Sequence, residues 1–274
     1  MTIHIGVIGS RRVVGSRLVE VERGVIPLNC TISDIGNIEK VLKEKRPDVI
    51  INAESRDDIE WCEKPNNQNE VIRINSRGLW NLAVVAEELK IPVIALSTDY
   101  IFDGKHGPYK EDIKRTLPVN YYGLSKWAME EGARAFNDVK VIRTSHLFWS
   151  KDPRIIKYLD EAYSQEKVKV PLWHRSFMHI DHFVNSLMIY IENYQRMPKI
   201  LNISGSETVD LFTFIRAFAD AVDFPFKYKL LRRYFDDKKA VKHPKRAGLD
   251  VSLSAKLGLP QYSYLDGLEL LKSE

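Results

Sequence analysis

The chain alternates short apolar segments with longer amphipathic ones, and this alternation constrains its fold more than any other feature. Apolar runs of strand length cover residues 3–8, 48–53, 91–97 and 139–143. Apolar residues recur at helical spacing in the intervening stretches 13–22, 38–44, 70–89 and 119–136. Strands that alternate with helices form a parallel sheet whose crossover helices cover both faces. We therefore expect an α/β protein with a doubly wound, mostly parallel sheet.

The second half of the chain is predicted to add a smaller C-terminal lobe to this sheet. Further helices are expected at 152–165, 182–194, 211–222 and 264–271, and strands at 167–171 and 200–203. A length of 274 residues suits one large α/β unit with a small lobe attached. We assign residues 1–147 and 168–207 to the sheet domain, and residues 148–167 and 208–274 to the lobe.

Composition narrows the classes of function and location. The chain has 41 basic and 37 acidic residues, and its basic clusters carry no nucleic-acid-binding pattern, so we expect no nucleic-acid partner. Cys30 and Cys62 have neither disulfide-framework nor metal-ligand spacing, and no metal site is expected. The first apolar run is too short for a signal sequence, and no run approaches the roughly 18 apolar residues of a membrane span. We expect a cytoplasmic protein without membrane contact.

A glycine-bearing turn follows the first predicted strand. Gly9 and Gly15 flank Ser-Arg-Arg-Val-Val, and such a turn lets the backbone approach a pyrophosphate at a helix N-terminus. Alone the pattern is weak, because many loops contain two glycines at this spacing. Arg11, Arg12 and Val14 lie in the same turn. A guanidinium there can bind phosphate oxygens, obstruct the site or point into solvent.

A second group of residues carries the chemistry of carbonyl reduction. Thr98 follows a predicted strand, at the end where doubly wound folds bind ligands, while Tyr122 and Lys126 share one face of a helix. Reduction of a ketone by hydride requires a proton for the developing alkoxide. A nearby ammonium lowers the pKa of a tyrosine from its usual value of about 10. The Thr98 hydroxyl can orient the carbonyl oxygen. The alternatives are an ordinary surface pair of Tyr122 with Lys126, and a strand-end hydroxyl that bonds the backbone.

These residues lie in segments that resemble the active-site segments of the extended short-chain dehydrogenase/reductases. The similarity is greatest to the dTDP-4-dehydrorhamnose reductase branch: residues 97–104 read STDYIFDG for its STDYVFDG, and residues 118–126 read PVNYYGLSK for its PxNxYGxxK. Further similar segments are 48–53, 71–86 with Asn75, 143–145, 202–205 and 247–250, so the resemblance covers nearly the whole chain. It implies a Rossmann-type dinucleotide-binding domain with a substrate-binding lobe.

The resemblance implies an NAD(P)H-dependent reductase of a nucleotide-linked 4-keto sugar such as dTDP-4-dehydrorhamnose. Tyr122 would be the proton donor, Lys126 its activator and ribose anchor, and Thr98 the hydroxyl that orients the carbonyl. The residues expected to line the cofactor, NADP or NAD with NADPH slightly favoured, are Gly9, Arg11, Arg12, Val14, Gly15, Asn52, Ala53 and Lys126. The residues expected to face the nucleotide sugar are Asp99, His146 and Arg175. A homodimer is common in this family.

The chain departs from the family pattern at three places. Arg12 stands at the middle glycine of the family's GxxGxxG turn. Only residues 16–30 separate Gly15 from Thr31, which replaces an aspartate on the adenine side, so that one strand is trimmed or lost. On the substrate side, His146 replaces a tryptophan and His243 an arginine. The altered adenosine half leaves a second hypothesis: a non-catalytic cofactor- or partner-binding relative, like the regulatory β subunit of methionine adenosyltransferase.

Overall fold

The computed structural model describes residues 3–113, 116–164, 167–224, 229–233 and 241–272. Its centre is one sheet of six parallel strands in the order β10-β5-β4-β3-β1-β2. The strands are β1 (Ile5–Ile8), β2 (Val25–Pro27), β3 (Val49–Asn52), β4 (Val93–Thr98), β5 (Val139–Thr144) and β10 (Ile200–Asn202). The predicted doubly wound parallel sheet is confirmed.

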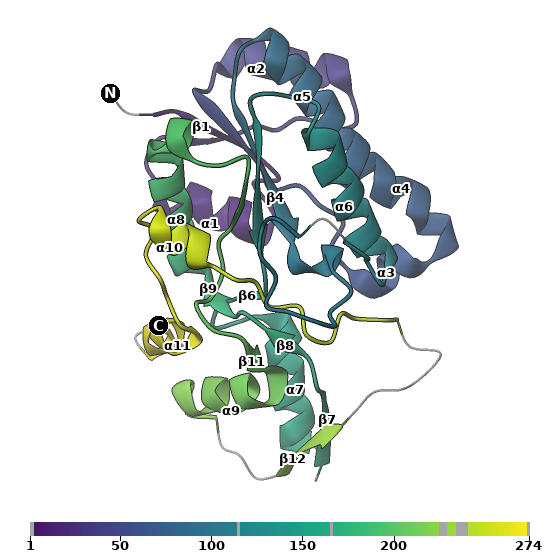
Figure 1. Cartoon of the computed structure of the whole chain (residues 1–274), viewed down its shortest axis with the longest axis vertical. Coiled ribbons are helices and arrows are strands. Elements are labelled where there is room, and N and C mark those ends of the chain that lie inside the picture. The colour runs from purple at the N-terminus through teal and green to yellow at the C-terminus, as the bar shows by residue number, and fades with distance from the viewer. Residues whose placement is uncertain (1–2, 114–115, 165–166, 225–228, 234–240, 273–274) are drawn as a thin grey trace.

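Helices cover both faces of this sheet (Figure 1). On one face lie α1 (Val13–Val21) and α8 (Ile180–Glu192). On the other lie α2 (Ile35–Lys45), α5 (Gly78–Glu88) and α6 (Tyr121–Ala133). Every residue of β1, β3 and β4 is buried, which is the reason these strands read as continuous apolar runs instead of alternating ones.

The strand order reverses between β1 and β3. From β1 the chain passes through α1 to β2 at the sheet edge, and then returns through α2 to β3 on the other side of β1. Ile8 pairs with Asn52, so the carboxyl ends of the two strands lie side by side. In open α/β sheets this switch point is where ligands bind.

Between α1 and α2 the chain forms only one short strand, in the region that is shorter than in the family pattern. The strand β2 has three residues, and the next element along the chain is α2, which Asp34 caps by accepting a 3.0 Å hydrogen bond from the Asn37 N–H. No further strand extends the sheet beyond β2 in the described part of the chain. The long helix predicted at 70–89 is present as α4 (Gln68–Ile72), a π-helical turn at Arg73–Arg77, and α5.

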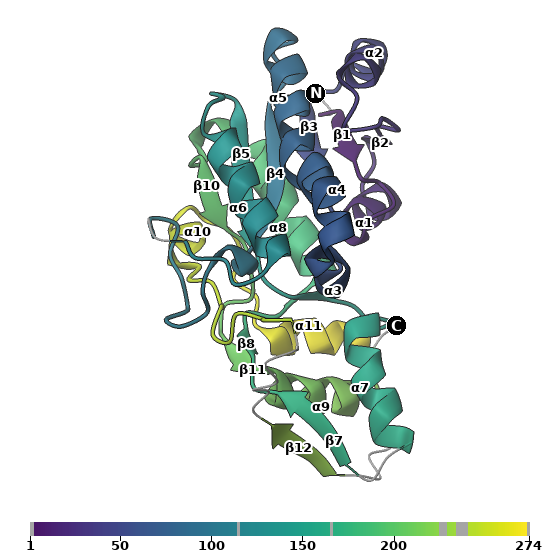
Figure 2. The same cartoon turned by 90° about the vertical axis from the view of Figure 1, so that its right-hand side faces the viewer.

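A smaller lobe lies at the carboxyl end of the sheet (Figures 1 and 2). Its helices are α7 (Pro153–Ser164), α9 (Leu211–Ala221) and α11 (Tyr264–Leu271). Its strand pairs are β7 (Lys167–Pro171) with β12 (Lys229–Arg233), and β8 (His174–Arg175) with β11 (Val209–Asp210). A third pair, β6 (Leu147–Phe148) with β9 (Met178–His179), lies where the two parts meet.

Three segments lie in a different part from the one that the sequence predicted. One is β8, which pairs with β11 in the lobe, although residues 174–175 were assigned to the sheet domain. Residues 168–171 were assigned to the sheet domain, but Val168 and Val170 alternate into the core of α7 and α9, and β7 pairs with β12. Conversely, α10 (Ser252–Lys256) packs on β10, and Leu259 joins the core under α8, so residues 252–259 lie with the sheet and not with the lobe.

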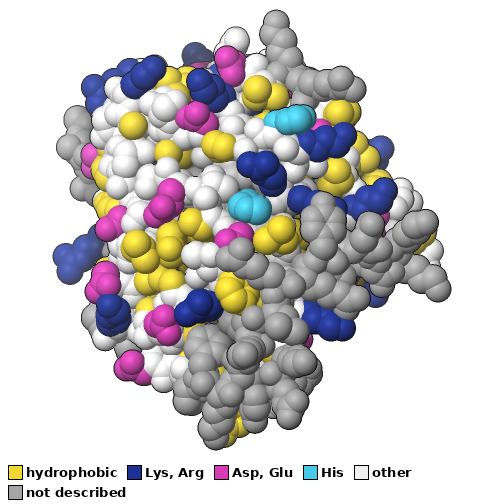
Figure 3. Space-filling view, turned by 60° about the horizontal axis from the view of Figure 1, so that its bottom comes forward, with side chains coloured by type: hydrophobic (Ala, Val, Ile, Leu, Met, Phe, Trp, Pro, Cys, Tyr) yellow, Lys and Arg dark blue, Asp and Glu magenta, His cyan; other side chains and the backbone are white. Residues whose placement is uncertain are grey.

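No helix among the residues described is long and apolar enough to cross a bilayer. On the face seen in Figure 3, Lys and Arg side chains are interspersed with Asp and Glu.

Candidate active site

The turn after β1 brings backbone close to the switch point. Gly9 has a φ of +79°, and a Cβ placed on it would lie 2.5 Å from the backbone nitrogen of Glu54. A Cβ on Gly15 would lie 2.2 Å from the Gly9 carbonyl oxygen. Both positions therefore require glycine, one for the left-handed turn and both for close packing. Arg12 precedes α1 without capping it through its side chain, so the first-turn N–H groups are open to an anion.

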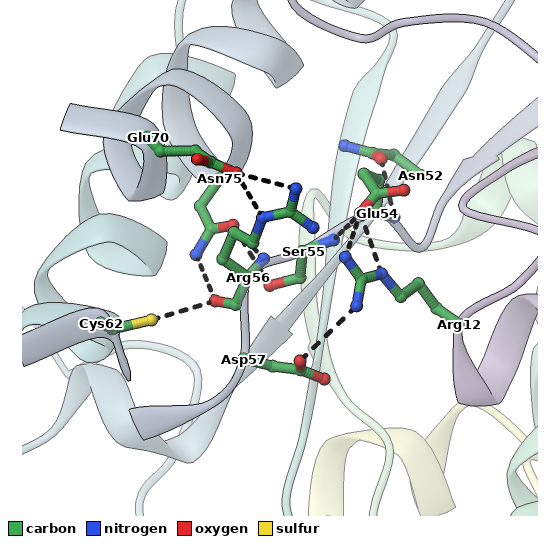
Figure 4. A network of polar contacts seen from close by, with 9 residues as sticks. All are labelled: Arg12, Asn52, Glu54, Ser55, Arg56, Asp57, Cys62, Glu70 and Asn75. Atoms are coloured by element: carbon green, nitrogen blue, oxygen red, sulfur yellow. Dashed lines mark hydrogen bonds and ion pairs between the residues drawn. The ribbon is translucent and has the colours of Figure 1, made fainter. Parts of the chain in front are cut away.

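The two arginines of this turn lie differently. Arg11 is exposed, whereas Arg12 reaches across the switch point to Glu54, just beyond the end of β3 (Figure 4). Its Nε and Nη2 atoms donate hydrogen bonds of 2.9 and 2.8 Å to Glu54 Oε1, and Nη1 lies 4.0 Å from Asp57 Oδ1. Sequence reasoning did not single out Glu54. The available signal was a carboxylate directly after a predicted buried strand, at the ligand-binding edge.

Asn52, Ala53 and Val14, all predicted to line the cofactor, surround the same turn. Asn52 is buried at the end of β3, and its Oδ1 accepts a 3.2 Å hydrogen bond from the Glu54 N–H. The Ala53 N–H donates to the Ile8 carbonyl at 2.9 Å, which continues the ladder between β3 and β1. Val14 is buried against the sheet from the first turn of α1. The structure therefore brings these predicted residues together.

Thr98 and Tyr122 meet where β4 ends and α6 begins. Asn120 caps α6 by accepting a 2.8 Å hydrogen bond from the Gly123 N–H, which sets the first turn that carries Tyr122. The Thr98 side chain lies next to the Tyr122 hydroxyl and acts to lower its pKa. Thr98 Oγ1 also accepts from the Tyr100 N–H at 3.3 Å. The sequence placed these two hydroxyls in one site, and the fold brings them together.

The electrostatics of Tyr122 differ from the sequence-based prediction. Burial raises the pKa of Tyr122, the charge of Asp57 raises it further, and the hydrogen bond with Thr98 opposes the rise only in part. Lys126 is buried, and its Nζ donates a 2.6 Å hydrogen bond to the Leu96 carbonyl. Burial also lowers the pKa of Lys126 to about 8, against the attraction of Glu130 and Asp57. The sequence predicted a lowered pKa for Tyr122, whereas burial of the phenol and the charge of Asp57 raise it.

The predicted substrate-facing residues Asp99 and Arg175 lie together next to Thr98. Asp99 Oδ2 accepts a 2.6 Å hydrogen bond from the Ser145 hydroxyl and lies 3.6 Å from Arg175 Nε. Burial raises the pKa of Asp99, while the charge of Arg175 opposes the rise. Arg175 is 3% exposed, and its Nη2 has no partner among the residues described. A buried N–H donor without a partner is costly, so this atom is available to a polar ligand.

His146, also predicted on the substrate side, is held by a buried carboxylate. Its Nε2 lies 3.1 Å from Oδ2 of Asp152, which is fully buried and also receives hydrogen bonds from Arg154. Burial lowers the pKa of His146 to about 4, so the ring is neutral at pH 7. Within the described residues, no three His, Cys, Asp or Glu side chains gather as metal ligands.

A second histidine, His243, reaches this side from the C-terminal segment. Its Nδ1 lies 2.9 Å from the Tyr100 hydroxyl, and its ring stacks on Trp173 with centroids 4.2 Å apart. Tyr100 in turn packs edge-on against Tyr122, with centroids 5.6 Å apart. A continuous set of aromatic and polar side chains thus connects Tyr122 to Trp173 in the lobe.

Asn75 fixes the loop that follows β3 (Figure 4). Its Oδ1 accepts from the Arg56 N–H at 2.7 Å, and its Nδ2 donates to the Arg56 carbonyl and to Ser125 Oγ, both at 2.9 Å. Asn75 is 1% exposed. Its amide is therefore engaged in tying the loop to α6, which is a structural role.

A buried ion pair connects the helix of the site, α6, to the neighbouring strands. The side chains of Arg143 on β5 and Glu130 on α6 are each 1% exposed. The Arg143 Nη2 atom lies 2.7 Å from Glu130 Oε2. Ser97 also donates a 2.5 Å hydrogen bond to Glu130. The pair joins α6, which carries Tyr122 and Lys126, to the two strands next to it. Sequence reasoning gave no role to Glu130.

Comparisons with known proteins agree with this arrangement. The family model described as the RmlD substrate binding domain matches residues 3–267. A dTDP-4-dehydrorhamnose reductase of Burkholderia thailandensis is 30% identical over 165 residues, which are 56% of this chain and 54% of that protein. The chain therefore spans about half the length of this curated relative. Methionine adenosyltransferase 2 subunit beta of Bos taurus is 26% identical over 242 residues, 83% of this chain and 70% of that one.

Solved structures show the same fold. The crystal structure of dTDP-4-dehydrorhamnose reductase from Bacillus anthracis, in complex with NADP, has a TM-score of 0.88 to this chain. The match covers 99% of both chains at 21% sequence identity.

Proposed function

Because the chain belongs to the RmlD substrate binding domain family, within the extended short-chain dehydrogenase/reductases, we propose that it is an NAD(P)H-dependent reductase of a nucleotide-linked 4-keto sugar. The observation that carries this proposal is that Thr98 and Tyr122 lie next to each other at the carboxyl end of β4, both against Tyr100. A carbonyl oxygen placed against this pair is within reach of both groups, which is the arrangement that protonation of a developing alkoxide needs.

The residues at the switch point fit a dinucleotide. Gly9 and Gly15 allow a tight turn, since a Cβ at either position would collide with backbone, and the uncapped start of α1 favours a negatively charged group. In the proposal this turn holds the pyrophosphate, Asn52 and Ala53 lie beside it, and Lys126 holds a ribose. When bound, NAD(P)H supplies the hydride that reduces the carbonyl carbon.

The protein's own residues account for the proton. Since burial raises the pKa of Tyr122, its hydroxyl is protonated at neutral pH and can act as the acid. Tyr122 donates this proton to the substrate oxygen while Thr98 orients that oxygen. The pKa of Lys126, about 8, keeps most of this side chain charged at pH 7, so it stabilises the phenolate that remains.

The substrate side is proposed to be the cluster of Asp99, His146 and Arg175. The unpartnered Nη2 of Arg175 provides a buried donor, and the neutral ring of His146, oriented by Asp152, provides a hydrogen-bonding group for the sugar. We take dTDP-4-dehydrorhamnose as the first substrate to test, and the cytoplasm and a homodimer as the proposed location and assembly.

The test is NADPH oxidation by the purified protein with dTDP-4-dehydrorhamnose and other keto-sugar nucleotides. Tyr122→Phe should abolish turnover without changing thermal unfolding, because only the acidic hydroxyl is removed. The neighbouring Tyr121→Phe is the matched control and should keep its activity. The proposal fails if the wild-type protein binds no NADPH and oxidises none with any keto-sugar nucleotide.

A second candidate function is a regulatory subunit that binds an enzyme and catalyses nothing. It is favoured by the alignment with methionine adenosyltransferase 2 subunit beta, which extends over 83% of this chain. On this alternative the chain should co-purify with a methionine adenosyltransferase, and Tyr122→Phe should leave that partner's activity unchanged. Substrate-dependent NADPH oxidation that Tyr122→Phe removes would exclude it.

A further inference from the structure

On the premise of the proposed function, we infer that Glu54 competes with the cofactor pyrophosphate for Arg12, and that these two residues together set the affinity for the dinucleotide. Glu54 lies just beyond the carboxyl end of β3, and Arg12 just beyond that of β1. The backbone of Glu54 packs directly against Gly9, since a Cβ on Gly9 would lie 2.5 Å from the Glu54 nitrogen. The ion pair therefore lies at the switch point, where a pyrophosphate approaches the turn.

The hydrogen bonds of the pair leave Arg12 little freedom for a phosphate (Figure 4). Glu54 Oε1 accepts from Arg12 Nε at 2.9 Å, from Arg12 Nη2 at 2.8 Å and from the Ser55 N–H at 3.2 Å. Asp57 lies 4.0 Å from the remaining terminal nitrogen. The nitrogens that would form a two-pronged contact with phosphate oxygens are thus already used by a carboxylate.

Burial makes this competition matter more than it would on the surface. The side chains of Arg12 and Glu54 are 31% and 25% exposed, so solvent and salt screen them only in part. A pyrophosphate is an anion, and Glu54 acts on it twice: it neutralises the nearest cation and it repels the phosphates itself. Binding requires Arg12 to leave Glu54, or the phosphates to approach a pair with no net charge.

Substitutions that remove the charge of one residue or of both separate these effects. Glu54→Gln keeps an oxygen that can accept from the Ser55 N–H, but it removes the negative charge and releases Arg12. Arg12→Gln leaves Glu54 unpaired beside the phosphates. The double variant restores a neutral pair without either ion. The expected order of affinity is therefore Glu54→Gln tightest, the wild type and the double variant close together, and Arg12→Gln weakest.

The chain supplies a matched control in the same loop. Arg56 and Glu70 form an ion pair of 2.8 Å, with side chains 36% and 37% exposed, and Glu70 lies on α4 (Figure 4). Glu70→Gln makes the same change in the protein's net charge without removing a carboxylate from the turn. Its affinity for the dinucleotide should equal that of the wild type.

The experiment is a fluorescence titration of NADPH and of NADH into the full-length wild type and these variants, at low and high salt. Glu54→Gln should tighten the binding of both cofactors roughly tenfold at low salt, and less at high salt, because both contain the pyrophosphate and screening weakens the contact. Glu54→Ala should shift the affinity in the same direction, which guards against an effect peculiar to glutamine. Thermal unfolding confirms that each variant is folded.

Several results would overturn the inference. Unchanged or weaker binding by Glu54→Gln would show that Glu54 does not compete. A gain confined to NADPH would place Arg12 on the 2′-phosphate instead of the pyrophosphate. An equal gain in Glu70→Gln would reduce the effect to net charge. If the wild type and every variant bind neither cofactor, the proposed function itself fails, whereas a wild type that binds while Glu54→Gln shows no gain contradicts only the inference.

Discussion

The buried ammonium of Lys126 donates a 2.6 Å hydrogen bond to the backbone carbonyl of Leu96, and so ties α6 to the middle of β4. Tyr122 lies four residues earlier on the same helix. The hydrogen bond does not offset the loss of solvent around the charge, since the pKa of Lys126 falls to about 8. This residue therefore links the proposed proton-transfer chemistry to the stability of the fold.

Replacing Lys126 by methionine should remove a pH-dependent part of the stability. An unfolded lysine has a pKa of about 10.4, whereas in the folded protein the pKa of Lys126 is about 8. Between these values the unfolded state holds more protons on Lys126 than the folded state, so the contribution of Lys126 to the free energy of unfolding should rise with pH over this range. The rise amounts to about 3 kcal/mol. Urea unfolding from neutral pH upward measures it as the difference between the wild type and Lys126→Met, which lacks this contribution.

The exposed Lys256 provides the control for this measurement. Lys256→Met should show the same rise with pH as the wild type, because an exposed ammonium is solvated in both states. If the stability of Lys126→Met changes with pH as that of the wild type does, another group titrates in this range and the account given for Lys126 is wrong.

Two adjacent glutamates on α6 should differ greatly in their effect on stability. Glu130 is fully buried against Arg143, so Glu130→Gln leaves a buried guanidinium without its counter-charge and should cost about 3–5 kcal/mol. Glu131 pairs with Arg134 on the surface, and Glu131→Gln should cost less than about 1 kcal/mol. Chemical denaturation of the two variants compares them directly. Similar losses would contradict the role assigned to the buried pair.

Much of the fold, and the grouping of Thr98, Tyr122 and Lys126 in one proposed site, could be predicted from local sequence. The strands β1, β3 and β4 are buried on both faces, so their apolar runs were visible without any structure. Thr98 was recognisable because it ends a buried strand, and Tyr122 with Lys126 because four residues separate them on a helix.

The parts that failed depend on contacts between distant segments. The pairing of Arg12 with Glu54 exists only because the chain returns from β2 to place β3 next to β1. The raised pKa of Tyr122 reflects how much of the fold covers it, which no spacing reports. The strand β7 was assigned to the wrong part because its partner, β12, begins 58 residues after β7 ends, and alternation alone does not say which core it joins.

Asn75 should stabilise the loop after β3 in proportion to the hydrogen bonds it makes with Arg56. Asn75→Asp keeps the acceptor for the Arg56 N–H but puts an acceptor, and a buried charge, opposite the Arg56 carbonyl, so it should cost at least about 3 kcal/mol. Asn81 makes a single 3.3 Å hydrogen bond to the Ile32 carbonyl from a half-buried position, and Asn81→Asp should cost about 1 kcal/mol. Thermal and urea unfolding test both, and equal losses would refute the structural role of Asn75.

Gly9 and Gly258 allow backbone strain to be separated from crowding in the turn after β1. Both have positive φ angles, +79° and +85°, but a Cβ on Gly258 meets nothing within 4 Å. Gly258→Ala should therefore cost only the strain of a left-handed alanine, about 1–2 kcal/mol. Gly9→Ala carries the same strain and also drives a methyl group against the backbone of Ala53 and Glu54, so it should cost about 3 kcal/mol or more. Urea unfolding gives both losses on one scale. If the two variants lose the same stability, the turn has room that the structure does not show, and its close approach to β3 is not what requires glycine at position 9.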